Sequence, residues 1–250
     1  MAEKKQVIVR VKRQVSPRGT AYWEEFALKW RPSMNVIICL RDIAENPVTR
    51  DGKKTTPVSY DSNCLEEVCG SCAMLINGRA RMACSALVDQ LEQPIRLEPF
   101  SKFPVVRDLA VDRQFMFDSL KRVKAWIPID GTYDLGEGPR MASETQAKAY
   151  KLSTCISCGS CLEVCPQVNE HNKFVGAAIV SQVRLFNMHP TGAMHAHERL
   201  NALTQPGGIQ ECGNAQNCVK ACPKEIPLTE SLAEVNRQVW KDALLGWLIG

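Results

Sequence analysis

The chain has 250 residues, of which 45% are hydrophobic and 23% charged. A chain of this length can bury the core of one large domain or two ordinary domains without needing disulfide bonds. Its net charge of +4 is spread along the sequence and argues against nucleic acid as a partner. No segment approaches the ~18 uninterrupted apolar residues of a membrane span, and the N-terminus shows no apolar signal segment. We therefore expect the reducing cytoplasm, where disulfides are rare.

The N-terminal part of the chain has the alternating pattern of strands. Val7–Lys12 alternates as a half-buried strand does, and Trp23–Lys29 repeats the pattern after the turn at Pro17 and Gly19. The short apolar run Val36–Ile43 favours a helix.

The first cysteine cluster follows. It has the spacing Cys-x4-Cys-x2-Cys plus one distant cysteine, which is typical of a plant-type 2Fe–2S site. Its members are Cys64, Cys69, Cys72 and Cys84. Gly70 and Ser71 suit a loop whose backbone passes close to the cluster and donates amide hydrogen bonds to its sulfurs. A four-thiolate zinc site is the alternative, but such sites usually use two spaced cysteine pairs.

A tight hairpin explains how the distant ligand reaches this site. Ala73–Ile76 and Arg79–Met82 flank Asn77-Gly78, the strongest short signal for a two-residue turn. Such a turn brings Cys84 back beside Cys72.

Beyond Val105 we expect the strands to stop. Asp108–Trp126 looks helical, and further helices are predicted at about 143–153, 175–187, 194–204 and 228–245. The sequence thus predicts an α+β protein, with a small β-rich domain over residues 1–108 and a helical domain over residues 109–250.

The helical part carries the second cysteine run, Cys155-x2-Cys158-x2-Cys161-x3-Cys165-Pro166. In this bacterial ferredoxin pattern the first three cysteines hold one cluster and the fourth ligates another. The Cys-Pro step turns the chain away from the local site. The predicted 4Fe–4S ligands are therefore Cys155, Cys158, Cys161 and Cys222.

The third run, Cys212-x5-Cys218-x3-Cys222-Pro223, has Ala215 where the pattern places a second cysteine. Alanine cannot ligate iron, so the site offers three thiolates, as a 3Fe–4S cluster requires. The predicted ligands are Cys165, Cys212 and Cys218. The alternative is a fourth iron held by water or a nearby side chain, but Asn214 and Gln216 are poor iron ligands.

The remaining candidates rank lower. Cys39 lies alone in an apolar run and is predicted to be a core residue. Four histidines are predicted to be solvated: His171, His189, His195 and His197. An apolar C-terminus is predicted to pack on the chain's own core rather than face a membrane partner; it comprises Trp240, Leu244, Leu245, Trp247, Leu248 and Ile249.

No Gly-x-Gly-x-x-Gly fingerprint, catalytic triad, carboxylate pair or P-loop accompanies these clusters, and we predict no catalytic residue. A chain that holds several redox clusters but no catalytic residue is expected to take electrons from one partner and pass them to another. The rival functions are a free ferredoxin-type carrier, which is normally shorter, and a zinc-stabilised binding module.

The cysteine runs, together with Asn63–Gly78, resemble the iron–sulfur subunit of succinate dehydrogenase and quinol:fumarate reductase. Three further segments are most similar to the version found with a di-haem cytochrome b in menaquinone-using bacteria: Leu91–Pro99, Lys124–Asp130 and Val183–Met194. The likeness covers nearly the whole chain. It implies a β-grasp, plant-type ferredoxin-like domain followed by an all-helical, bacterial-ferredoxin-like domain.

The resemblance also implies partners. These are a flavoprotein subunit with covalent FAD, where succinate is oxidised or fumarate reduced, and a membrane-anchoring cytochrome b subunit that carries haem b and reaches menaquinone. The chain is then peripheral, on the cytoplasmic face of the membrane. Electrons would run from FAD through 2Fe–2S, 4Fe–4S and 3Fe–4S to quinone, or in reverse in a fumarate reductase.

One departure concerns the quinone. Many relatives carry a tryptophan shortly after the first Cys-Pro and a histidine directly after the first cysteine of the third run. Here these places read Gln167–Glu170 and Gly213. We therefore expect this chain to supply no quinone ligand, which leaves the menaquinone site on the cytochrome.

Overall fold

The computed structural model describes residues 6–128 and 140–249, with side chains up to Leu244. The chain divides into two compact units. The N-terminal unit is Met1–Arg113 with Ile156–Glu163, and the C-terminal unit is Gln114–Cys155 with Val164–Gly250. The second cysteine run is thus shared between the units. The predicted continuous domains, 1–108 and 109–250, stay a prediction.

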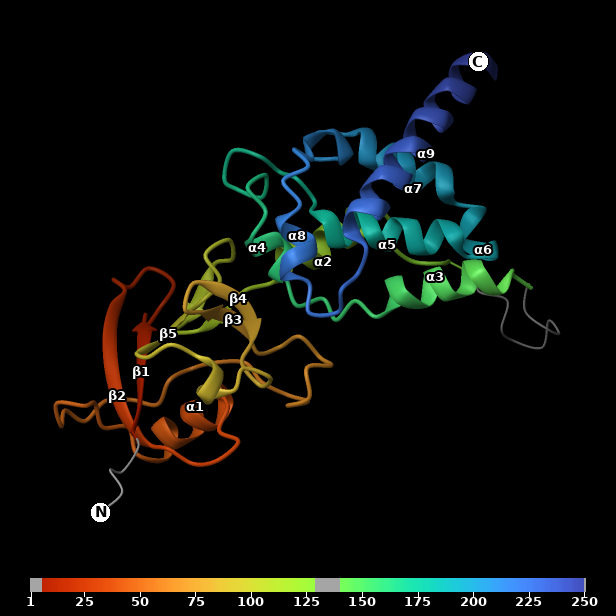
Figure 1. Cartoon of the computed structure of the whole chain (residues 1–250). Helices are drawn as coiled ribbons and strands as arrows, with labels where there is room; N and C mark the ends of the chain where they lie inside the picture. The colour runs from red at the N-terminus through yellow and green to blue at the C-terminus, as the bar shows by residue number, and fades with distance from the viewer. Residues whose placement is uncertain (1–5, 129–139, 250) are drawn as a thin grey trace. The chain divides into compact units, whose positions relative to one another are not determined.

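A five-stranded sheet with the order β2-β1-β5-β3-β4 forms the centre of the N-terminal unit (Figure 1). Its strands are β1 (Gln6–Arg13), β2 (Tyr22–Lys29), β3 (Ala73–Ile76), β4 (Arg79–Met82) and β5 (Ile95–Glu98). All neighbours are antiparallel except β1 and β5, which run parallel. The predicted strands at 7–12 and 23–29 and the predicted hairpin are confirmed. The mixed order is that of the expected β-grasp fold.

The sheet is half-buried, as its alternating sequence predicts. Val7, Val9 and Val11 of β1 are buried, and Val9 lies opposite Phe26 of β2 and Ile95 of β5. Period-two alternation places these side chains on one face. The apolar residues of the unit therefore gather on that face.

Helix α1 (Val36–Glu45) confirms the predicted helix. Asn35 caps it, because its side chain accepts a hydrogen bond from the amide of Ile38 at 2.9 Å. Its buried residues recur at helical spacing: Val36, Ile37, Cys39, Leu40 and Ile43. Such a stripe is the face that an amphipathic helix turns toward a core. A short 3₁₀ turn, η1 (Val88–Gln90), and helix α4 (Ser160–Glu163) complete the helices of this unit.

The prediction that strands stop at Val105 is wrong, and the helix predicted over 108–126 is confirmed only in its middle part. Two short strands, β6 (Val105–Arg107) and β7 (Ala110–Val111), pair antiparallel, and the helix α2 spans only Gln114–Arg122. Asp108 has φ +48° and a fully buried side chain that four donors engage, so the backbone turns there instead of continuing into a helix.

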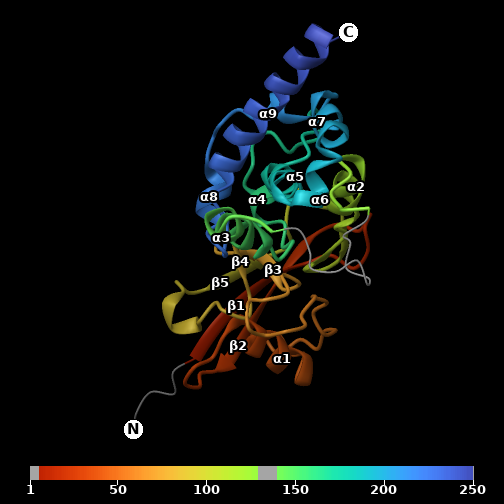
Figure 2. The same ribbon diagram turned by 90° about the vertical axis from the view of Figure 1, so that its right-hand side faces the viewer.

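The C-terminal unit is helical. Besides α2 it contains α3 (Ser143–Ser153), α5 (Ala177–Met188), α6 (Pro190–Ala193), α7 (Ala196–Thr204), η2 (Ile209–Glu211), α8 (Asn217–Ala221) and α9 (Leu228–Ile249). Helix α5 is the centre of the unit and contacts α2, α3, α6, α7 and α9 (Figures 1 and 2). Its first residues are buried on every side, from Ala177 to Ser181. The four predicted helices correspond to α3, α5, α7 and α9.

The prediction that the apolar C-terminus packs on the chain's own core is wrong for its described side chains. Trp240 is 65% exposed and Leu244 is 58% exposed. The last turns of α9 extend past α7 in both views (Figures 1 and 2). The side chains of Leu245, Trp247, Leu248 and Ile249 lie outside those that the structure describes. None of the helices within residues 6–128 and 140–249 has the length and apolar character that a membrane span requires.

Candidate iron–sulfur sites

The first cysteine loop surrounds its sulfurs with backbone amides. Leu65, Glu67 and Gly70 have positive φ angles of 63°, 56° and 75°, which curl the chain so that successive N–H groups point inward. Five amides lie at 3.3–3.5 Å from a cysteine sulfur: Glu66, Val68 and Cys69 on Cys64, Glu67 on Cys84, and Ser71 on Cys69. Such N–H···S contacts stabilise negative sulfur, which a thiolate-bound cluster requires.

The β3–β4 hairpin brings Cys84 back beside Cys72, as the sequence predicts. The amide of Ala83 donates to the carbonyl of Cys72 at 3.1 Å, directly outside the last strand pair. Burial, followed by the neighbouring Cys72 thiol, raises the pKa of Cys84 to about 11. Hydrogen bonds from the Cys64 amide and the Ser71 hydroxyl lower the pKa of Cys69 to about 6. Hydrogen bonds therefore favour the thiolate form of Cys69, whereas burial disfavours the thiolate form of Cys84.

The second cysteine run contributes to both units. Cys158 and Cys161 are buried in the N-terminal unit, where Ser157 and Gly159 have φ angles of 49° and 84° that turn the chain into α4. Cys155 belongs to the C-terminal unit, as does Cys222 of the third run.

Helix α4 is fixed by its own carboxylate. Glu163 accepts hydrogen bonds from the amides of Ser101 and Lys102, both at 3.0 Å, and from the Ser101 hydroxyl at 2.7 Å. Because Glu163 is 7% exposed, these bonds tie the Cys158–Cys161 segment to the N-terminal unit. No local pattern points to Glu163, because its partners Ser101 and Lys102 lie 62 and 61 positions away.

Three cysteines of the C-terminal unit line one hollow. They are Cys165, Cys212 and Cys218, and Ala215 lies on the same wall. Burial raises the pKa of Cys218, and the neighbouring Cys165 and Cys212 sulfurs raise it further. The backbone just before α8 carries positive φ at Asn214 (51°) and Gln216 (61°), which turns the loop around the hollow. The geometry gathers the three thiols that the spacing predicts.

In the same hollow, Gly213 lies beside the side chain of Gln167. A Cβ on Gly213 would lie 2.7 Å from Nε2 of Gln167. Both residues line the hollow, so the Gln167 side chain occupies the space beside Gly213.

Within residues 6–128 and 140–249, no three or more His, Cys, Asp or Glu side chains converge as one metal ion requires. A cluster distributes its thiolates over several irons, so its fit depends on the loop chemistry instead. The amides around the first four cysteines and the three thiols around one hollow fit such groups.

Among the lower-ranked residues, Cys39, His171, His195 and His197 behave as predicted, whereas His189 is half-buried and its Nδ1 accepts a hydrogen bond from the amide of Gly192 at 3.3 Å. Cys39 is fully buried in α1, and burial raises its pKa to about 12. His195 and His197 are exposed and contact the carboxylates of Glu198 and Asp242, at 3.3 Å and 2.9 Å. These histidines lie on the surface and contact no cysteine.

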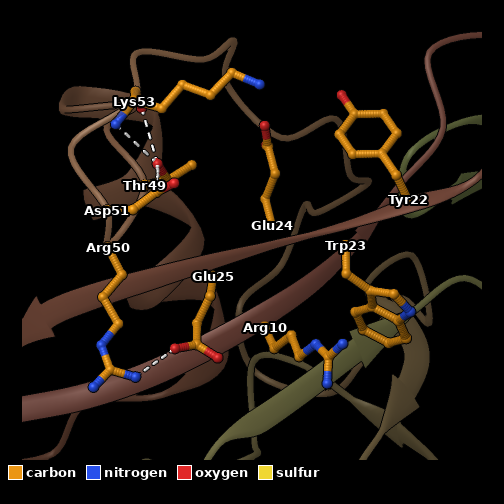
Figure 3. Close-up of a pocket in the computed structure, with 9 residues that line it drawn as sticks. All are labelled: Arg10, Tyr22, Trp23, Glu24, Glu25, Thr49, Arg50, Asp51 and Lys53. Carbon is orange, nitrogen blue, oxygen red and sulfur yellow. Dashed lines mark hydrogen bonds and ion pairs between the residues drawn. The ribbon is translucent and has the colours of Figure 1, made fainter.

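A cavity of about 650 Å³ lies beside β2, and no cysteine lines it (Figure 3). The guanidinium of Arg10 stacks on Trp23 at 4.9 Å from the ring centroid, and Arg50 pairs with Glu25 at 2.6 Å. Arg10, Arg50 and Glu25 therefore have partners within the unit, and no predicted cluster ligand lines this cavity.

Comparison with known proteins matches two cluster-binding domain families to the two parts of the chain that contain the cysteine runs. Residues 8–118 match the sequence profile of the 2Fe-2S iron-sulfur cluster binding domain, and residues 151–226 match that of the 4Fe-4S dicluster domain. The succinate dehydrogenase iron-sulfur subunit of Bacillus subtilis is 61% identical over 95% of this chain and 94% of its own length. The fumarate reductase iron-sulfur subunit of Wolinella succinogenes is 30% identical over 87% of this chain and 90% of its own length.

A solved structure shows the same fold. A chain of the Mycobacterium smegmatis Sdh1 complex in the apo form superposes with a TM-score of 0.79 at 23% identity, covering 95% of this chain and 96% of that one.

Fold and cysteine loops together define an iron–sulfur protein that joins a 2Fe–2S domain to a dicluster domain. More narrowly, the chain belongs to the family of iron–sulfur subunits of succinate dehydrogenase and fumarate reductase.

Proposed function

We propose that this chain is the electron-transfer subunit of a succinate:quinone oxidoreductase, working between a flavoprotein subunit with covalent FAD and a membrane-anchoring cytochrome b subunit with haem b. Bound clusters would accept and release single electrons between these partners. The observation that carries the proposal is the joint match of both cluster-binding domains on one chain that is 61% identical to a succinate dehydrogenase subunit.

The proposed ligand sets follow the spacing. They are Cys64, Cys69, Cys72 and Cys84 for 2Fe–2S; Cys155, Cys158, Cys161 and Cys222 for 4Fe–4S; and Cys165, Cys212 and Cys218 for 3Fe–4S. Support for the first set comes from the amides on its sulfurs, and for the third from the shared hollow. The second set takes ligands from both units and rests on the spacing alone.

Succinate oxidation is favoured over fumarate reduction because identity to the Bacillus subtilis succinate dehydrogenase subunit is 61%, against 30% to the Wolinella succinogenes fumarate reductase subunit. The chain would lie on the cytoplasmic face of the membrane and reach menaquinone only through the anchor. In support, the Gln167 side chain fills the space beside Gly213.

The test is to purify the complex under anaerobic conditions, count its iron and record EPR spectra of oxidised and reduced samples. We expect about nine irons per chain and three separate signals, including the sharp isotropic signal of an oxidised three-iron cluster. A colourless protein containing zinc would overturn the proposal. An oxidised sample without the three-iron signal would overturn only the 3Fe–4S assignment.

A further inference from the structure

Arg113 clamps the loop between two of the proposed 2Fe–2S ligands. Its Nη1 donates to the carbonyl of Gly70 and its Nη2 to the carbonyl of Ser71, both at 2.8 Å. Gly70 and Ser71 are the two residues that separate Cys69 from Cys72. The rigid fork of a guanidinium therefore fixes two consecutive peptide planes.

The fixed planes carry the loop's sulfur contacts. The amide of Ser71 lies 3.5 Å from the sulfur of Cys69, and the Ser71 hydroxyl lies 3.4 Å from the same atom. Because Arg113 holds the carbonyls of Gly70 and Ser71, the amide groups in the same two peptide planes cannot rotate away from the cysteine sulfurs. Hydrogen bonds to sulfur are one of the means by which a protein sets a cluster's potential.

No ion pair between Arg113 and a carboxylate is present in the described part of the chain. Within residues 6–128 and 140–249, its hydrogen bonds go to the two loop carbonyls, and its Nε is buried with no hydrogen-bond partner. A positive charge in a partly buried place is weakly screened. It therefore favours the more negative, reduced state of a group held by this loop.

The clamped residue also touches the second cysteine run. Gly70 has φ +75°, and a Cβ there would lie 3.0 Å from Cα of Cys158 and closer still to the carbonyl of Ile156. All these residues belong to the N-terminal unit. Holding Gly70 in place therefore also keeps the first cysteine loop packed against Ile156–Cys158.

We propose that Arg113 is a positioning residue for the 2Fe–2S site: it holds Gly70 and Ser71 by their carbonyls and places an unpaired positive charge that raises the reduction potential there. The proposal rests on the proposed function. It assigns a role to a residue that precedes α2, more than forty positions beyond the loop, and that supplies no ligand.

Three variants of the full complex test it. Arg113→Gln removes the charge and the fork, Arg113→Lys keeps the charge but cannot bridge both carbonyls, and Arg18→Gln removes an exposed arginine of the same unit as the matched control. EPR-monitored redox titration measures the potential of each cluster. Hydrogen exchange of the metal-free chain measures protection of the amides of residues 70–72.

In Arg113→Gln we expect the 2Fe–2S reduction constant to fall about tenfold, a shift of about 59 mV to lower potential for one electron. The reduction potentials of the other two clusters should be unchanged, and hydrogen exchange of the amides of residues 70–72 should become faster. Arg113→Lys should recover most of the potential but not the protection. Loss of the 2Fe–2S signal alone in Arg113→Gln, with the other two intact, supports the same role.

Three results would overturn the proposal: a 2Fe–2S potential in Arg113→Gln equal to that of Arg18→Gln, an equal shift in all clusters, or loss of all three together. Absence of a 2Fe–2S signal from the unaltered complex would instead count against the proposed function.

Discussion

Arg13 donates from Nε to Oδ1 of Asp108 at 3.0 Å, and neither side chain reaches solvent. Arg13 also pairs with Glu24, while the second oxygen of Asp108 accepts the amide of Ser59 at 2.9 Å. This cluster joins β1, β2 and the turn between β6 and β7 to the segment that leads into the first cysteine loop. It is also the reason that the chain turns at Asp108.

Arg13→Met is expected to destabilise the protein by about 3–5 kcal/mol, because it leaves two buried carboxylates without their cation. Urea unfolding followed by tryptophan fluorescence measures the change. Arg31→Met is the control, since the Arg31 guanidinium is exposed and solvent screens its ion pair with Asp42, so that its loss should change stability far less. Equal costs for the two variants would contradict this account.

Gly70→Ala is expected to abolish 2Fe–2S incorporation. Alanine at φ +75° costs about 1–2 kcal/mol in any setting, and here its Cβ would also collide with the Ile156 carbonyl. Gly78→Ala separates the two effects, because Gly78 has the same φ and nothing within 4 Å of an added Cβ. Iron content and the 2Fe–2S EPR signal should be lost in the first variant and kept in the second. If both variants kept their iron and the 2Fe–2S EPR signal, the close approach of Gly70 to the Ile156 carbonyl would not be needed for the cluster.

Cys39 should be inert. Burial raises its pKa to about 12, so only about a ten-thousandth of the thiol is ionised at pH 8. Iodoacetamide should label it in urea but not in the folded protein, as mass spectrometry of the peptides would show. Rapid labelling without denaturant would contradict its place in the core.

The same shift makes stability fall at high pH. Above about pH 8.5 the unfolded thiol loses its proton while the folded one keeps it, so the free energy of unfolding decreases as pH rises toward 12. Cys39→Ala should therefore make the free energy of unfolding depend less on pH between about pH 9 and pH 11. Its iron content should be unchanged, because Cys39 is not among the proposed ligands.

Ala215→Cys should convert the three-iron site. The residue lines the hollow with Cys165, Cys212 and Cys218, so a thiolate at this position can supply the missing fourth ligand. We expect the oxidised three-iron EPR signal to disappear and about one more iron per chain to be retained. Ala215→Ser, which keeps the size but offers a weaker ligand, serves as the control. A variant that keeps the three-iron signal at full intensity would argue against this hollow as the site.

Gly213→Ala should leave the affinity of a quinone-site inhibitor for the complex unchanged. The added Cβ would lie 2.7 Å from Nε2 of Gln167, which must shift, but this atom is the far end of a flexible side chain. Glu170→Gln should behave in the same way. A large change in inhibitor affinity in either variant would place a quinone beside this hollow.

Much of the fold and of the candidate sites follows from neighbouring residues. The alternation of β1, the Asn77-Gly78 turn and the return of Cys84 beside Cys72 all depend on dihedral preferences and strand geometry over a few residues. The same holds for the missing cysteine ligand at position 215, where the chain has Ala215, because the ligands of a cluster are predicted from residue type and spacing alone.

What the sequence could not predict depends on contacts between distant positions. The apolar residues within 108–126 favoured a helix, but Asp108 is held by Arg13 ninety-five positions away and becomes a turn. Arg113 offered no local signal, since its partners are the carbonyls of Gly70 and Ser71. The exposure of Trp240 likewise depends on which part of α9 other helices cover, and this is a matter of tertiary packing. Local patterns fix backbone conformation and ligand identity, whereas only tertiary packing decides which distant groups meet and which charges stay uncompensated.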